Sequence, residues 1–168
     1  MSAGRLYSQW RVEDVSMGTW RTFSRLTKAE RLVALEAAVG LTATWIALRT
    51  VGFRRWRKVL ESLAIRKNTN APAAEISIRE IANVVRMEEA AARNLFFHIN
   101  CLEQSLVLWW LLQKRGVAAD LLIGARKNAN RFEAHAWVEF AGAALNSTGE
   151  GHLHFVPFEE QITWMGTN

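Results

Sequence analysis

Cys101 and His135 are the two residues of this chain whose chemistry best suits a nucleophilic enzyme. Cys101 is the only cysteine, and it stands at the start of an apolar run that is typical of a buried helix. A thiol reacts as its thiolate, which a helix N-terminus or a nearby imidazole stabilises. With Asn100 as the N-cap, the unpaired backbone N–H groups near Cys101 would also bind an oxyanion. Taken alone, a single cysteine in this position is more often a packing residue.

The general base must be a histidine that the fold brings beside Cys101. The chain has four candidates, which are His98, His135, His152 and His154. His98 is too close in sequence to Cys101 for good base geometry, and the last two lie in a glycine-flanked tail. His135 lies in the sequence AHAWVE, where strand alternation puts it on one face with Trp137 and Glu139. A histidine that points from a sheet toward the N-terminus of a packed helix is a papain-like arrangement.

Two other interpretations of these residues stay open at this point. Trp137 either forms a wall of the site or is an aromatic residue of the core. A metal site formed by His98, Cys101 and His135 is conceivable, but the chain contains no CxxC pair and no HExxH motif. We therefore expect neither a metal nor a cofactor.

Three helices are predicted to position these residues. The tetrapeptides TKAE (27–30) and SIRE (77–80) have the spacing of capping boxes. They predict a helix from about residue 28 to the low 50s and an amphipathic helix over about 78–93. A third helix begins at Asn100 or Cys101, is apolar nearly all round and stops at Gly116, so it belongs in the middle of the fold.

The pattern changes to short alternating runs after Gly116, which predicts an antiparallel sheet. Strands are expected over 117–123, 132–140 and 143–147, with a polar loop over 126–131 and a turn at 141–142. Helices followed by an antiparallel sheet make an α+β fold. We expect an N-terminal helical region over 1–75 and a core over 76–168 that carries the nucleophile helix packed on the sheet.

Composition narrows the class of protein. Hydrophobic residues make up 50% of the chain and charged residues 22%, as in a folded domain. A single cysteine and the absence of a visible secretory signal favour the cytoplasm. A net charge of +5 would suit binding to a nucleic acid, a membrane or an acidic peptide.

The stretch 77–98 has the apolar spacing of a helix-turn-helix but lacks a turn glycine, so we expect no nucleic acid as a partner. Residues 37–58 fit contact with a membrane surface.

The run CLEQSLVLWWLLQKRG (101–116), followed by HAWVE (135–139), resembles the transglutaminase-like cysteine peptidases of lasso-peptide biosynthesis. The match covers about residues 95–147, and the apolar helix near Thr27 is similar to the N-terminal part of that family. The resemblance implies that Cys101 is the nucleophile and His135 the general base. It also implies the reaction, which is removal of the leader peptide from a ribosomally made precursor before macrolactam formation.

The third catalytic residue departs from the family pattern. An aspartate on the next strand orients the histidine in the family, but this chain has only Asp14 and Asp120, and neither follows His135. The family position falls at about Ser147. An asparagine can hold an imidazole by its side-chain carbonyl, so Asn146 is the hypothesis and Ser147 the alternative. Asp120 and Glu150 are less favoured candidates for the third catalytic residue.

The resemblance also implies partners. Little sequence precedes the Thr27 helix, so we expect a stand-alone protease that works with a separate precursor-recognition protein and an ATP-dependent, asparagine-synthetase-like macrolactam cyclase. Two rival functions stay open. One is a transamidase or amidase that uses the same Cys-His core, and the other is a non-catalytic basic binding protein.

Overall fold

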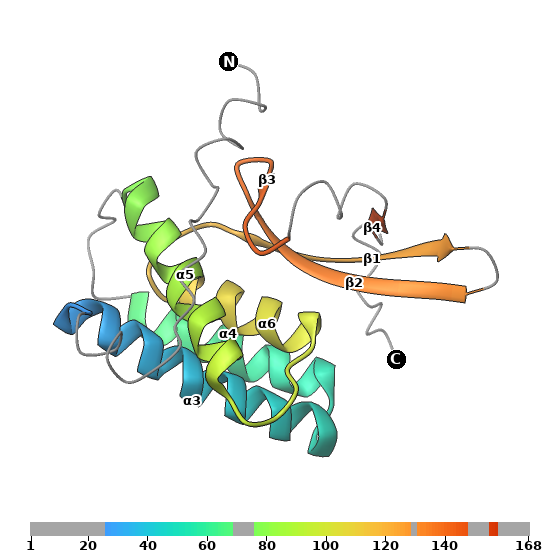
Figure 1. The fold of residues 1–168 in the computed structure, drawn as a ribbon, viewed down its shortest axis with the longest axis horizontal. Coiled ribbons are helices and arrows are strands. Elements are labelled where there is room, and N and C mark those ends of the chain that lie inside the picture. The colour runs from blue at the N-terminus through green and yellow to red at the C-terminus, as the bar shows by residue number, and fades with distance from the viewer. Residues whose placement is uncertain (1–25, 69–75, 129–130, 148–154, 158–168) are drawn as a thin grey trace.

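The computed structural model describes residues 26–68, 76–128, 131–147 and 155–157. Within these ranges the helices are α3 (Lys28–Thr50), α4 (Phe53–Asn68), α5 (Ile78–Asn94) and α6 (Cys101–Gln113). The strands are β1 (Asp120–Asn128), β2 (Arg131–Phe140), β3 (Ala143–Ala144) and β4 (Val156–Pro157), and they form one antiparallel sheet in the order β3-β2-β1-β4. The helices lie together on one side of this sheet (Figure 1). The α+β class predicted from the sequence is confirmed.

The helix starts follow the predicted signals. Capping boxes are present at Thr27 with Glu30 and at Ser77 with Glu80, and in each the carboxylate accepts from the backbone N–H of the N-cap residue at 2.8 Å. The segment 77–98 contains α5 followed by non-helical residues from 95 to 98. It is therefore one packed helix and not a helix-turn-helix.

The helix α4 was not predicted from the sequence, because the basic residues of 53–58 do not indicate which side of a helix would be buried. Gly52 has φ +81°, a conformation that favours glycine, and it ends α3 so that the chain can turn into α4. Trp56 of α4 then donates its indole N–H to the fully buried hydroxyl of Thr44 at 2.9 Å. This contact fixes the pair of helices against each other.

The centre of the core is α6, as its all-round apolar character predicted. It packs on all three other helices and on both long strands. Its residues Leu106, Val107, Leu108, Leu111 and Leu112 have no exposed surface. The predicted division of the chain at residue 75 stays a prediction, but α3 packs directly on α5 and α6.

α3 is long and apolar enough to cross a membrane by length and composition. One of its sides lies in the core, where Ala37 and Leu41 have no exposed surface. Gly40 lets this side approach α6 closely, because a Cβ atom there would meet Val107 at 3.1 Å. The helix is therefore packed as a core element along that side.

The sheet extends further than predicted. Residues 126–128 and 131 were expected in a polar loop, but they pair across β1 and β2. Arg126 lies opposite Glu133, and their side chains form an ion pair at 2.6 Å, a cross-strand contact that stabilises the hairpin. Of the strand predicted over 143–147, only Ala143 and Ala144 pair as β3, and β4, which was not predicted, pairs with Gly124 and Ala125.

Candidate active site

Cys101 is the first residue of α6, and Asn100 is its N-cap with an extended backbone. The thiol is partly exposed and free. Its place in the first turn puts it beside backbone N–H groups that have no partner within the helix. The predicted position of the nucleophile at a helix N-terminus is thus the one observed.

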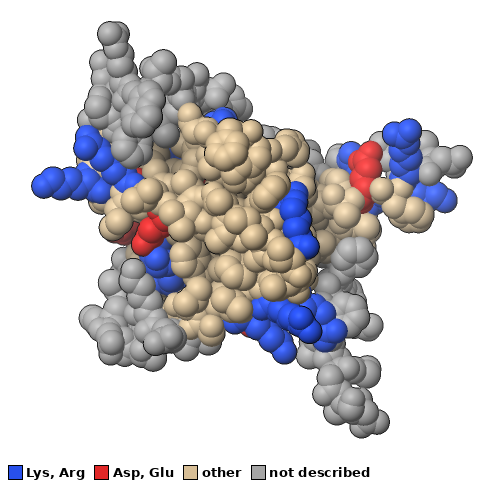
Figure 2. All heavy atoms as spheres, turned by 90° about the horizontal axis from the view of Figure 1, so that it is seen from below, with Lys and Arg blue, Asp and Glu red and all other residues tan. Residues whose placement is uncertain are grey.

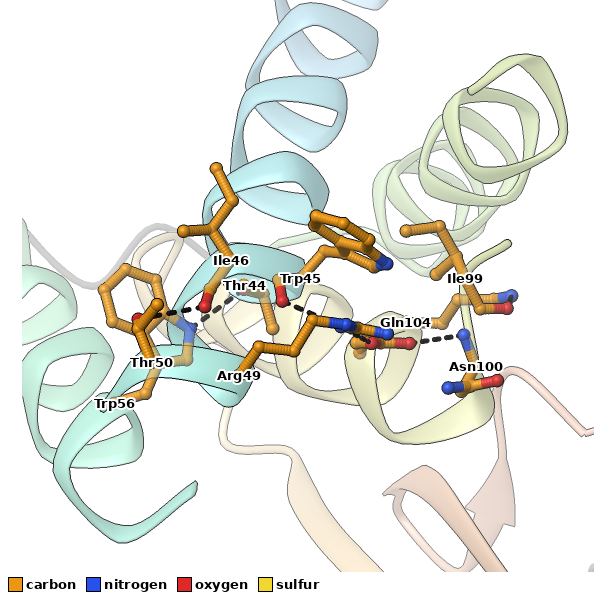
Figure 3. A network of polar contacts seen from close by, with 10 residues as sticks. Thr44, Trp45, Ile46, Arg49, Thr50, Trp56, Ile99, Asn100 and Gln104 are labelled. Carbon is orange, nitrogen blue, oxygen red and sulfur yellow. Dashed lines mark hydrogen bonds and ion pairs between the residues drawn. The ribbon is translucent and has the colours of Figure 1, made fainter. Parts of the chain in front are cut away.

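A buried carboxylate organises this helix start. Glu103 is almost fully buried, and it accepts hydrogen bonds from the backbone N–H of Asn100 and from the guanidinium of Arg49, the latter at 2.8 Å. Arg49 also donates to the carbonyl of Trp45 and lies 4.2 Å from the centre of its ring. Figure 3 shows this network running from the end of α3 to Asn100. It holds the residue before Cys101 in the position that opens the helix.

Ser105 joins α6, which carries Cys101, to β2, which carries His135. Its hydroxyl has no exposed surface, donates to the backbone carbonyl of Ala136 at 2.9 Å and accepts from the side-chain amide of Asn146 at 2.9 Å. The amide oxygen of Asn146 in turn accepts from the backbone N–H of Val138 at 2.8 Å. β3 pairs only with residues 139 and 140 of β2. Just before these residues, the side chains of Ser105 and Asn146 therefore supply the hydrogen bonds that the carbonyl of Ala136 and the N–H of Val138 need at the edge of β2.

This contact relates the helix of Cys101 to the strand of His135. Residues four apart lie on the same side of a helix, and the rise between them is about 6 Å. Cys101 therefore lies one turn from the point where Ser105 touches Ala136, which is the neighbour of His135 in β2. The fold thus packs the helix that carries Cys101 against the strand that carries His135, while the approach of the thiol to the imidazole stays a prediction.

His135 contacts two aromatic rings. Its ring stacks on Trp137 with centroids 6.0 Å apart, and the ring of Phe155 lies 5.3 Å away. Gly124 pairs with His135 across the sheet, and a Cβ atom there would meet the carbonyl oxygen of Val156 at 2.8 Å and the Trp137 ring at 3.0 Å. Only glycine leaves room for β4 and Phe155 to approach the histidine this closely. Trp137 is itself buried, so it serves both as a wall beside His135 and as a packed aromatic residue.

An open hollow of about 590 Å³ lies beside the first turns of α6. It is lined by the end of α5, by residues 95–99, by Gln104 and by Asn146. Its wall carries Glu89, whose pKa burial raises while the nearby Arg93 partly offsets that effect. Phe96 stands almost wholly exposed at the rim and meets Phe97 edge to face. The hollow combines aromatic surface with a carboxylate, a guanidinium and two amides.

Comparison with known protein families identifies the superfamily of this chain. The model of the transglutaminase-like superfamily (Transglut_core3) matches residues 47–160, which is more than half of the chain. This chain belongs to the transglutaminase-like superfamily. Comparison with curated proteins and with solved structures gave no match. Members of the superfamily are commonly cysteine-type peptidases or acyltransferases, and the match includes both Cys101 and His135.

The third member of the transglutaminase-like site stays a prediction. Asn146 contacts Ser105 and the backbone of Val138, so it supports the histidine strand through its edge. Its neighbour Ser147 is partly buried. Asp120 pairs with Glu139 at the far end of the strands, four residues along β1 from the partner of His135. Glu150, His152 and His154 lie outside the described residues.

Four residues around the candidate site were given no role from the sequence, namely Glu103, Ser105, Gly124 and Phe155, although Ser105 and Gly124 belong to the motif that carries the resemblance. The signal for Glu103 was its position three residues after the N-cap, which is the capping-box position. The signal for Ser105 was that it is the one hydroxyl residue on a mostly apolar helix, where a buried hydroxyl needs a hydrogen-bond partner. Within the described ranges, no group of three or more His, Cys, Asp or Glu side chains could hold a metal ion.

Proposed function

We propose that this protein is a cysteine peptidase that cleaves the leader peptide from a lasso-peptide precursor. The observation that carries the proposal is the tie between Ser105 and Ala136, which sets the Cys101 helix against the His135 strand in a transglutaminase-like chain. The CLEQSL and HAWVE motifs, which resemble those of the lasso-peptide peptidases, support the choice of substrate.

The reaction is hydrolysis of the amide bond at the junction of leader and core. His135 accepts the proton of the Cys101 thiol, and the thiolate attacks the carbonyl carbon. Backbone N–H groups in the first turn of α6 stabilise the oxyanion. The carbon–nitrogen bond then breaks, and the imidazolium gives its proton to the leaving amine of the core peptide. Water attacks the thioester with His135 as base, which frees the leader as a carboxylate and restores the thiol.

The hollow beside α6 is the proposed binding site for the precursor chain near the scissile bond. It opens next to Gln104, three residues after the nucleophile. A separate precursor-recognition protein would hold the rest of the leader, and an asparagine-synthetase-like cyclase would take the released core peptide. Both partners follow from the resemblance, whereas the proposed cytoplasmic location rests on the single cysteine.

The test is mass spectrometry of the precursor peptide after incubation with the protein and the recognition protein. Replacing Cys101 or His135 by Ala is expected to lower kcat by at least about a thousandfold while the far-UV spectrum is unchanged. Ser62→Ala, on the exposed side of α4, is the control and is expected to cleave normally. A Cys101→Ala protein that still processes the precursor would refute the proposal.

Transamidation is the second candidate, because acyltransferases belong to the same superfamily. Hydrolysis adds one water to the products, whereas transamidation joins an added amine to the leader, so the product masses separate the two reactions. Comparison of Asn146→Ala with Ser147→Ala in the same assay assigns the third residue. The Asn146 hypothesis fails if only the Ser147 change slows turnover.

A further inference from the structure

One side of α3 lies outside the core and is apolar along most of its length. Leu32, Leu35, Val39 and Ile46 are each between 50% and 62% exposed. Their spacing of three, four and seven residues puts them in one row, which we call the α3 stripe, about 21 Å long. Single exposed aliphatic residues are ordinary on a protein surface, but an aligned row of four is typical of an interaction site.

Two threonines of α3 bind their hydroxyl groups to backbone carbonyls of the same helix. Thr42, which continues the α3 stripe between Val39 and Ile46, donates its hydroxyl to the carbonyl of Ala38 at 2.8 Å. Thr50 donates to the carbonyl of Ile46 at 3.0 Å. Such bonds satisfy the hydroxyl without water, which is how Ser and Thr are accommodated in helices that face lipid. The stripe therefore presents no donor that needs an aqueous partner.

Charge is arranged around the α3 stripe in a consistent way. The only charged residue between Leu32 and Leu48 is Glu36, which is partly buried and bound to Lys114 and Arg115 at 2.8 Å each. Cations stand beyond both ends: Lys28 precedes the stripe, while exposed Arg54, Arg55 and Lys58 follow the Gly52 turn. Figure 2 shows the α3 and α4 side as a broad area without charged side chains, with Lys and Arg at several points of its border and Asp or Glu at one edge.

We propose that the α3 stripe docks on the surface of a membrane that contains anionic lipids. An apolar helix face bordered by Lys and Arg enters the boundary between headgroups and acyl chains, and anionic lipids attract the border. A second copy of this chain fits poorly, because the cationic ends of two α3 helices would meet in a symmetric antiparallel pairing. A protein partner would need acidic groups at both ends of one apolar helix, whereas an anionic membrane is negative everywhere. α3 lies along this surface and does not cross it, since its other side is buried against α5 and α6.

The test is sedimentation of the full-length protein with vesicles of phosphatidylglycerol and phosphatidylcholine, compared with vesicles of phosphatidylcholine alone. The wild-type protein is expected to bind the anionic vesicles and to be released by high salt. The double variant Leu35→Ser/Val39→Ser is expected to lower the partition coefficient by about tenfold or more. Phe132→Ser is its matched control, because Phe132 is an exposed apolar residue on β2 and does not belong to the stripe.

The charged border is tested in the same way. Arg55→Gln/Lys58→Gln is expected to reduce binding to anionic vesicles about tenfold, while Arg131→Gln, an exposed cation on β2, leaves it unchanged. Circular dichroism confirms that each variant is folded.

The proposal is overturned if the wild-type protein does not bind anionic vesicles, or if the control variants lose as much binding as the stripe variants. It is also overturned if light scattering shows a dimer that the stripe variant abolishes, since a second copy would then cover the face. Vesicle binding does not depend on peptidase activity, so this outcome is independent of the proposed reaction.

Discussion

Replacement of Ser105 by Ala tests whether one hydroxyl joins the nucleophile helix to the histidine strand. The hydroxyl has no exposed surface and makes two hydrogen bonds of 2.9 Å, to the carbonyl of Ala136 and from the amide of Asn146. Without it, the carbonyl of Ala136 is left in a place that water reaches poorly, whereas the amide of Asn146 is only part-buried and lines the open hollow. A lost buried hydrogen bond costs about 1 kcal/mol, and a buried group left without a partner costs about 1–3 kcal/mol.

The expected loss for Ser105→Ala is therefore about 2–4 kcal/mol of the free energy of unfolding, measured by urea denaturation. A change of about 3 kcal/mol lowers the Tm of a domain of this size by roughly 6–12 °C. The matched control is Ser62→Ala, which removes an exposed hydroxyl bonded only to its own helix at Val59. It is expected to change stability by less than about 0.5 kcal/mol.

A double-mutant cycle then shows whether Ser105 and Asn146 act as one unit. Asn146→Ala breaks the bonds to Ser105 and to the backbone of Val138. Because the two residues share a bond, the double variant is expected to lose about 1 kcal/mol less than the two single losses added together. The reasoning is refuted if Ser105→Ala is as mild as Ser62→Ala, or if the two losses simply add.

Three further predictions concern buried charge and close packing. Burial raises the pKa of Glu88 well above its usual value, the charge of Glu89 adds to this, and Arg93 opposes it. The folded state thus binds a proton that the unfolded state releases, so the contribution of Glu88 to stability is complete below the ordinary pKa and is lost as pH rises toward the folded one. Glu88→Met is expected to reduce the fall in unfolding free energy between about pH 5 and about pH 8, and equal slopes in urea titrations would contradict this. Gly124→Ala forces a Cβ atom against Val156 and Trp137 and is expected to cost about 1–3 kcal/mol and to slow precursor cleavage, whereas an unaltered Tm and kcat would show that β4 does not need this close approach. Arg49→Met leaves the buried Glu103 carboxylate without its cation and is expected to cost about 1–3 kcal/mol, since Arg49 itself is about half exposed. Arg57→Met, in a partly exposed ion pair between neighbouring turns of α4, is the control at less than about 1 kcal/mol, and equal losses would contradict the argument.

Local signals in the sequence determined most helix boundaries. The capping boxes at 27–30 and 77–80 mark helix starts because the side chains that satisfy the first N–H groups lie only three residues apart. The all-round apolar run after Cys101 likewise required a central helix. α4 and β4 lacked such signals. The buried side of α4 is defined by the residues of α3 and α6 that it packs on, so the sequence of α4 alone does not reveal it. β4 is only two residues long and exists because it pairs with the edge of β1.

For the candidate site, the residue types in the sequence pointed to a nucleophile and a base but could not give their surroundings. The position of Cys101 at a helix N-terminus is local, so it could be predicted. The bond from Ser105 to Ala136, the bond from Arg49 to Glu103 and the approach of Phe155 to His135 join residues far apart in the chain. Such contacts depend on how whole elements pack, because a hydrogen bond needs its two atoms within about 3 Å and no local pattern encodes that separation. The sequence by itself therefore determined which groups can react, and the tertiary structure decided what holds them in place.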